Sequence, residues 1–237
     1  ITATHDKPYS TDANMLGLTH EAGLLEDLGT ASDLIEPGMG CFAKDAPDEA
    51  EIFSVRFEKG QPVAINGEAV GPIAAIEQSN AIAGRHGVGI GLHAVENRFV
   101  GIKSRGVYEA PGLELLGQCY EFLLQLVLDR RARKIFAPVS DFISEQIYQG
   151  YWFDTATQAS WQLVDHLNQL ATGTIAVSLF KGNVAFHAAS DAPHSLYSED
   201  TASMEDIGDF DHRDSEGFLG VLGVSARALN QAGQTSL

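Results

Sequence analysis

The spacing of apolar residues changes twice along the chain, and this limits the possible folds more than any other sequence feature. Apolar residues alternate with polar ones over residues 53–57 and 175–179, a pattern typical of half-buried strands. Between them, residues 113–127, 136–147 and 161–170 carry apolar side chains three and four positions apart, which predicts three amphipathic helices. Strands separated by a run of helices favour an α+β fold, in which antiparallel strands and hairpins pack with about three helices.

Turn and cap signals predict further elements. Lys181-Gly182-Asn183 precedes an apolar stretch and predicts a β-hairpin, and Asn66-Gly67 predicts a second tight turn. A helix is expected over residues 72–83, with a proline at its start and a glycine just after its end. Residues 95–103 are expected to form one strand. Residues 221–232 predict a short terminal helix that docks either on its own domain or on a partner chain.

Charge and composition restrict the class of partner. The chain has 15 basic and 32 acidic residues, which gives a formal net charge of −17. This field repels phosphate backbones and anionic lipid, so neither nucleic acid nor a membrane is expected as a partner. No apolar run reaches the roughly 18 residues of a membrane-spanning helix. Cys41 and Cys119 are the only cysteines, and two free thiols in a cytoplasmic protein are favoured over one disulfide.

No pattern in the sequence predicts a metal site. Eight acidic residues lie between Glu199 and Glu216, and a solvated acidic loop is the favoured interpretation. Calcium binding is the alternative, but the Asp-x-Asp-x-Asp-Gly spacing with its closing glutamate is missing from this stretch. The eight histidines form no zinc-ligand spacing, and no cysteine pair lies beside them.

Polar residues near the start of the chain predict a small-molecule site. If residues 10–14 are extended, Ser10, Asp12 and Asn14 point to one side, where a hydroxyl, a carboxylate and an amide suit a small polar ligand. The alternative is a turn or a helix cap, which these residue types also favour. Thr19 and Glu21 could add a hydroxyl and a carboxylate, unless they lie in a surface loop.

A second group of polar residues lies in the middle of the chain. Glu96 and Arg98 share one face of the predicted strand, where they either pair with each other or bind a ligand. Residues 103–109 place donors around one glycine, and Ser104, Arg105 and Tyr108 suit a ligand carboxylate unless they form a basic turn. Residues 87–91 are glycine-rich but follow a helix rather than a strand, so a phosphate-binding loop is disfavoured there.

Three stretches resemble one known family. Residues 9–27 (YSTDANMLGLTHEAGLLED), 84–89 (GRHGVG) and 95–112 (VENRFVGIKSRGVYEAPG) are similar to signature sequences of argininosuccinate synthase, and weaker similarity continues to Gly217-Phe218. That family condenses citrulline with aspartate, uses ATP, and releases argininosuccinate, AMP and diphosphate, in arginine biosynthesis and the urea cycle. The resemblance therefore implies a carbon–nitrogen ligase that works through a citrullyl-adenylate.

The resemblance also implies roles for individual residues. Ser10, Thr19, Glu96 and Tyr108 fall where the family contacts citrulline. By charge, Glu96 is expected to balance the α-ammonium, while the hydroxyls bind the carboxylate. Residues with an expected supporting role are Asp12, Asn14, Arg98, Ser104 and Arg105. No catalytic residue is assigned, because the chemistry needs positioning and charge stabilisation rather than a covalent side chain.

One departure from the family is large. The Ser-Gly-Gly-x-Asp phosphate loop of its ATP-binding half has no counterpart here, so ATP with magnesium, and aspartate, are expected to bind mainly to an N-terminal domain that this chain lacks. We expect a citrulline-binding synthetase domain at 1–218 and a helical arm at 219–237 that supports a homotetramer. The isolated chain is expected to be inactive. The alternative is a non-catalytic amino-acid-binding or assembly module without its ATPase half.

Overall fold

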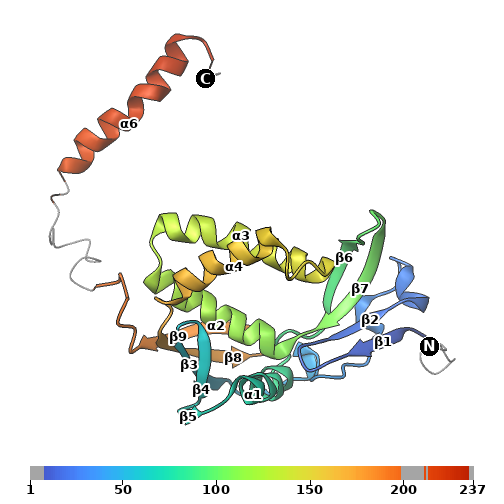
Figure 1. The fold of residues 1–237 in the computed structure, drawn as a ribbon. Coiled ribbons are helices and arrows are strands. Elements are labelled where there is room, and N and C mark those ends of the chain that lie inside the picture. Colours follow the sequence, from blue (N-terminus) through green and yellow to red (C-terminus); the bar gives the residue numbers. More distant parts are fainter. Residues whose placement is uncertain (1–7, 199–210, 212, 235–237) are drawn as a thin grey trace. The chain divides into compact units, whose positions relative to one another are not determined.

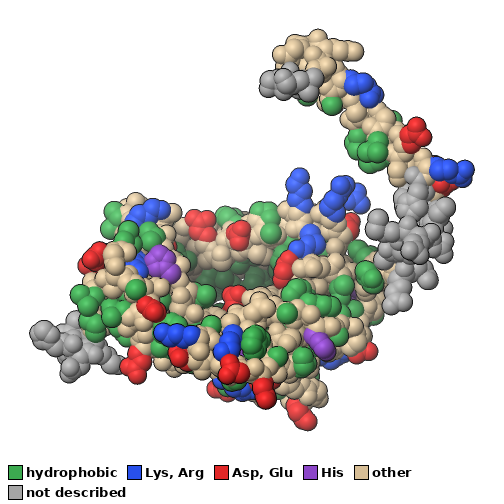
Figure 2. Space-filling view, turned by 180° about the vertical axis from the view of Figure 1, so that it is seen from behind, with side chains coloured by type: hydrophobic (Ala, Val, Ile, Leu, Met, Phe, Trp, Pro, Cys, Tyr) green, Lys and Arg blue, Asp and Glu red, His purple; other side chains and the backbone are tan. Residues whose placement is uncertain are grey.

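The computed structural model describes residues 8–198, 211 and 213–234. It divides the chain into two compact units, Ile1–Ser195 and Leu196–Leu237. The first unit holds two antiparallel sheets and four α-helices, which confirms the predicted α+β class (Figure 1). Its surface mixes acidic, basic and apolar side chains and is hollowed near the middle of the view in Figure 2.

The larger sheet has five strands in the order β5-β4-β3-β8-β9, with every neighbouring pair antiparallel. Its strands are β3 (Glu51–Glu58), β4 (Gln61–Ile65), β5 (Glu68–Ala69), β8 (Gly173–Phe180) and β9 (Asn183–Ser190). Three two-residue turns join its hairpins: Lys59-Gly60, Asn66-Gly67 and Lys181-Gly182. Both residues of each turn have positive φ, as type I′ turns require. The predicted hairpin at 175–188 is confirmed.

Four helices belong to the first unit: α1 (Pro72–Arg85), α2 (Pro111–Val127), α3 (Arg130–Gln149) and α4 (Thr155–Asn168). The apolar face of α2 packs on the larger sheet, where Leu115 and Leu123 join Phe53 and Val177 in one fully buried core. Helix α1 packs against α2, and α3 packs against α4. The third predicted helix ends at Asn168, two residues earlier than expected, and strand β8 follows from Gly173.

The smaller sheet carries the candidate site. It has four antiparallel strands in the order β1-β2-β7-β6, namely β1 (Ser10–Ala13), β2 (Leu18–Glu21), β6 (Leu92–Asn97) and β7 (Lys103–Glu109). The prediction of a single strand over 95–103 is wrong. The chain reverses at residues 98–102, where the Arg98 amide donates to the Ile102 carbonyl (2.8 Å) and Gly101 takes a φ of +85°. The alternatives considered for residues 19–21 and 103–109, a surface loop and a basic turn, are excluded because both segments are strands.

The second unit contains the helix α6 (Asp214–Gln231), which begins seven residues before the predicted start at 221. None of its residues is buried within this chain, and Phe218, Leu219 and Leu222 expose their side chains. Most of the acidic stretch from 199 to 216 lies outside the described residues. Among the described helices, none is long and apolar enough to cross a membrane. The functional division at residues 218 and 219 remains a prediction.

Candidate functional site

One face of the smaller sheet gathers polar side chains from all four strands. Register places Asp12 opposite Thr19, and Thr19 opposite Tyr108, so these three side chains point to the same side. Side chains alternate between the two faces of a strand, so residues two positions before or after these three, and the residues opposite them on β6, point to that side as well. We call this surface the polar face, and it consists of Ser10, Asp12, Thr19, Glu21, Glu96, Ser104 and Tyr108. A cavity of about 390 Å³ lies beside its Asp12, Thr19 and Tyr108.

Tyr108 and Glu96 are joined across the sheet. The phenol hydroxyl of Tyr108 donates a hydrogen bond to the Glu96 carboxylate. The aromatic ring lies over Gly106, because a Cβ added there would be only 2.7 Å from both the Tyr108 hydroxyl and ring atom Cε2. Burial, the bond to Glu96 and the charge of Glu21 raise the Tyr108 pKa above its usual value, so the hydroxyl keeps its proton.

The four residues predicted to contact citrulline therefore share one surface. The Ser10 hydroxyl donates to the backbone carbonyl of Glu21 (3.1 Å), which ties β1 to β2. Thr19 is half-buried between the strands that carry Ser10 and Tyr108. Glu96 is exposed on the edge strand β6. Two of the predicted supporting residues, Asp12 and Ser104, lie on the same face.

Arg105 was predicted to support ligand binding, but it lies on the opposite face of β7 from Tyr108. Its guanidinium is occupied by the neighbouring loop, where it donates to the backbone carbonyls of Leu25 (3.0 Å), Asp27 (2.7 Å) and Thr30 (2.8 Å). Its Nε also donates to a His93 ring nitrogen (3.0 Å). The side chain thus holds the loop after β2 in place.

Asn14 and Arg98 also differ from the prediction. Asn14 lies beyond the end of β1, and its side-chain oxygen accepts a hydrogen bond from the Leu16 amide (2.8 Å), so the turn interpretation holds for this residue. Arg98 lies in the β6–β7 turn instead of on the strand face with Glu96. The ion pairs of the described residues do not include Glu96 with Arg98, and the Glu96 carboxylate accepts a hydrogen bond from Tyr108.

Comparison with known proteins decides the family. The family model for the "Arginosuccinate synthase C-terminal domain" matches residues 9–229. The chain belongs to the argininosuccinate synthase family. Proteins named argininosuccinate synthase are 40% identical in Rhodopirellula baltica, 41% in Nitratidesulfovibrio vulgaris and 39% in Desulfitobacterium hafniense. These matches cover 95–97% of this chain but only 56–57% of the relatives, so the chain spans a little over half their length.

A buried pair on the far side of the sheet supports the polar face in this argininosuccinate synthase family member. His20 is 2% exposed and Glu109 is 0% exposed, and Nε2 of His20 lies 2.6 Å from the Glu109 carboxylate. That carboxylate also accepts from the backbone amides of Gly38 and Met39 (2.7–3.1 Å). Sequence reasoning missed this pair, because 89 positions separate the two residues.

The glycine-rich stretch of this family member serves packing. A Cβ at Gly87 would lie 2.7 Å from the Cα of Ala43, and one at Gly89 would lie 2.8 Å from the Cα of Pro111. The backbone that a phosphate would approach is therefore covered by neighbouring backbone. The described residues contain no cluster of histidine, cysteine and acidic side chains able to hold a metal ion. Both cysteines are free, as predicted, and burial raises the pKa of Cys119 to about 12.

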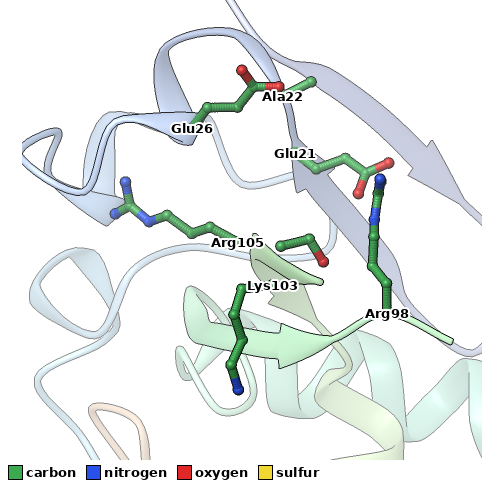
Figure 3. A pocket seen from close by; sticks show the side chains of 7 residues that line it. Glu21, Ala22, Glu26, Arg98, Lys103 and Arg105 are labelled. Atoms are coloured by element: carbon green, nitrogen blue, oxygen red, sulfur yellow. The ribbon is translucent and has the colours of Figure 1, made fainter. Parts of the chain in front are cut away.

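A second cavity, of about 330 Å³, adjoins the polar face. We call it the Arg98 notch, and it is lined by Glu21, Ala22, Glu26, Arg98, Lys103, Ser104 and Arg105 (Figure 3). It forms because β2 ends at Glu21 while β7 continues to Lys103 and pairs there with β6. Glu21 and Ser104 belong to both surfaces, so the notch and the polar face are continuous.

Proposed function

We propose that this chain supplies the citrulline-binding part of an ATP-dependent ligase that condenses citrulline with aspartate to argininosuccinate and releases AMP and diphosphate. The observation that carries the proposal is the polar face, where Ser10, Thr19, Glu96 and Tyr108 share one side of one sheet. Membership of the argininosuccinate synthase family supports the substrate. The proposal includes a citrullyl-adenylate intermediate, from which the aspartate amine displaces AMP.

The hydrogen bonds already present on the polar face determine which end of a ligand suits it. A hydroxyl has one hydrogen to donate. Tyr108 gives its hydrogen to Glu96, and Ser10 gives its hydrogen to the Glu21 carbonyl, so both oxygens are left as acceptors. The sequence predicts that the hydroxyls of Ser10, Thr19 and Tyr108 bind the ligand carboxylate. The acceptor oxygens of Ser10 and Tyr108, next to the carboxylate of Glu96, are better suited to the α-ammonium of citrulline, which has three donors.

The chain's own part in the reaction is binding and orientation. Holding the ammonium end of citrulline against Glu96 and Tyr108 fixes where the neutral ureido group can lie, and positioning of this kind is a large share of such catalysis. The glycine-rich stretch at 87–91 does not fit the phosphates of ATP, because Gly87 and Gly89 are packed against backbone. We therefore assign ATP, magnesium and aspartate to another segment. The proposal also includes a homotetramer assembled through α6 and a cytoplasmic location.

Calorimetry with citrulline tests the assignment of the polar face. Glu96→Gln removes the charge but keeps the size of the side chain, and one hydrogen bond to a charged group contributes about 1.5–3 kcal/mol. At ~1.4 kcal/mol per tenfold, citrulline affinity should fall roughly 10- to 150-fold. The matched control is Glu77→Gln, an exposed position on α1 that should bind as wild type does. Equal affinities for wild type and Glu96→Gln would remove Glu96 from the ligand contacts.

The polar face is equally compatible with one rival function, a non-catalytic amino-acid-binding or assembly module, because binding an amino acid needs no catalysis. The two functions differ in what happens when the rest of a relative's sequence is supplied. The portion of one of the relatives that this chain does not match, added in trans with ATP, aspartate and citrulline, should give argininosuccinate if the ligase assignment is right. Citrulline binding without product under those conditions would support the rival function.

A further inference from the structure

The side of the smaller sheet opposite the polar face carries three side chains joined by hydrogen bonds. Register places Thr11 opposite His20 and Leu18 opposite Glu109, so all four side chains point away from the polar face. The Thr11 hydroxyl oxygen lies 3.1 Å from Nδ1 of His20, and Nε2 of the same ring lies 2.6 Å from the Glu109 carboxylate. A hydroxyl, an imidazole and a carboxylate are thus connected in the order that nucleophilic catalysis uses.

The surroundings of Glu109 determine which ring nitrogen of His20 carries hydrogen. Both carboxylate oxygens accept from backbone amides, Oε1 from Gly38 (2.9 Å) and Oε2 from Met39 (2.7 Å). A carboxylate held as an acceptor in this way makes Nε2 of His20 the donor. In the neutral ring Nδ1 then has a free lone pair, which accepts the hydrogen of the Thr11 hydroxyl. Thr11 therefore already lies against a general base.

The hydroxyl end of this group opens into a cavity of about 400 Å³, which we call the far-side cavity. Thr11 is exposed, whereas His20 is 2% exposed and Glu109 is 0% exposed. The reactive end is thus accessible to a small molecule, while the base and the carboxylate behind it are shielded from water. The cavity is within the range of roughly 300–1,000 Å³ that small-molecule sites occupy. Its lining includes Tyr9, Thr11, Leu18, His20, Glu36 and Pro37.

The lining restricts the class of substrate. Leu18 and Pro37 offer apolar contacts for a short acyl chain, and the Glu36 carboxylate disfavours an anionic substrate. The Tyr9 hydroxyl accepts from the Glu36 amide (2.8 Å), and its own hydrogen is not used in a hydrogen bond among the described residues. This hydrogen is available to the negative oxygen that forms when a carbonyl carbon is attacked. A neutral ester of a small acid fits these groups.

We propose that the far-side cavity is an acyl-transfer site that hydrolyses neutral esters of short-chain carboxylic acids, with Thr11 as the nucleophile and His20 as the general base. The Thr11 oxygen forms a bond to the ester carbonyl carbon, and its proton moves to Nδ1 of His20. The bond from that carbon to the alcohol oxygen then breaks, and the alcohol leaves with the proton.

Water completes the reaction by attacking the acyl group on Thr11. It gives a proton to Nδ1, the bond to the Thr11 oxygen breaks, and that oxygen takes the proton back as the carboxylic acid leaves. Glu109 is a positioning residue, because it acts on the substrate only through His20. The activity does not rest on the proposed function, since the citrulline contacts lie on the other face of the sheet.

Hydrolysis of 4-nitrophenyl acetate by the 237-residue chain tests the nucleophile. A positioned base contributes roughly 100-fold or more to such a reaction, so Thr11→Val should lower the rate of 4-nitrophenolate release at least tenfold. Thr11→Ser keeps the hydroxyl and should retain the activity. Mass spectrometry of the acylated protein should place the acetyl group on Thr11. The matched control is Thr155→Val, an exposed threonine at the start of α4, which should react as wild type does.

Two further variants test the roles of the neighbouring carboxylates. Glu109→Gln can present an amide hydrogen to Nε2 of His20, so the nitrogen NMR signals of this ring should move toward the other tautomer and kcat should fall while KM changes little. Wild type should hydrolyse the anionic mono-4-nitrophenyl succinate more slowly than the neutral acetate, and Glu36→Gln should narrow this difference. If Glu109→Gln fails to fold, the exposed Thr11 variants still decide the question.

The outcomes are distinct from those that concern citrulline. The inference is overturned if wild type hydrolyses the acetate no faster than buffer does, or if Thr11→Val reacts as fast as wild type. It is also overturned if the acetyl group is found on another side chain and Thr11 carries none. Thr11→Val should bind citrulline as wild type does, so a failure of the acyl-transfer site leaves the proposed function in place.

Discussion

Replacing Gly106 by alanine should move the Tyr108 ring while leaving the sheet beneath it folded. The added Cβ would stand 2.7 Å from the phenol oxygen and 2.8 Å from ring carbon Cζ, closer than non-bonded carbon atoms approach. The φ of Gly106 is not positive, so the backbone accepts alanine, and only the ring must give way. The expected result is loss of the hydrogen bond from Tyr108 to Glu96.

The size of the effect follows from the ligand contact that the displaced Tyr108 oxygen loses. A hydrogen bond to a charged group such as the citrulline ammonium is worth about 1.5–3 kcal/mol, which corresponds to a loss of citrulline affinity of roughly 10- to 150-fold. The free energy of unfolding should fall by less than ~2.5 kcal/mol, because the lost bond to the exposed Glu96 contributes about 0.5–1.5 kcal/mol, a shifted side chain costs about 0.5–1.5 kcal/mol, and alanine in a strand interior gains about 0.5–1 kcal/mol. Urea denaturation measures the second quantity, and calorimetry with citrulline measures the first.

A double-mutant comparison shows whether the effect passes through Tyr108. In a Tyr108→Phe background the hydroxyl is already gone, so Gly106→Ala should cause little further loss of affinity. The control is Gly117→Ala in α2, where an added Cβ meets no atom within 4 Å. The reasoning is refuted if Gly106→Ala binds citrulline as tightly as wild type. It is also refuted if the loss is equally large in both backgrounds.

Three further predictions concern the supports of the site. His20→Ala should lower the free energy of unfolding by about 3–5 kcal/mol in urea denaturation, because it leaves the buried Glu109 carboxylate without its side-chain partner, whereas the exposed His166→Ala should change it little. Tyr108→Phe should reduce the loss of stability that occurs above about pH 10. Because the pKa of Tyr108 is raised in the folded state, the unfolded chain releases this proton at a lower pH, and rising pH therefore favours unfolding. An unchanged free energy of unfolding across the alkaline range would contradict this. Arg105→Ala should speed amide hydrogen exchange across residues 25–30, and unchanged exchange there would show that its three carbonyl bonds are dispensable.

Local signals were sufficient for most of the fold. The dipeptides Asn66-Gly67 and Lys181-Gly182 both form turns with positive φ, and Pro72 and Pro111 both begin helices. The turn at 98–102, which the sequence analysis missed, carries almost no such local signal. Its apolar residues continue the strand pattern, and only Gly101 hints that the chain reverses there.

The candidate site depends on which strands pair and in which register, and residue spacing along the sequence does not reveal this. Alternation alone could place Ser10 and Asp12 on one side of a strand, but only register brings Thr19 and Tyr108 beside them. The same limit explains Arg105, whose residue type suits a carboxylate. Its strand face directs it instead to the loop after β2.

The central claim is that this chain binds the amino-acid end of citrulline on the polar face. A crystal structure of the chain soaked with citrulline tests this most directly. We expect the α-ammonium within hydrogen-bonding distance of Glu96 and the Tyr108 hydroxyl oxygen. Citrulline bound instead on the opposite side of the sheet, in the cavity beside Thr11 and His20, would contradict the account.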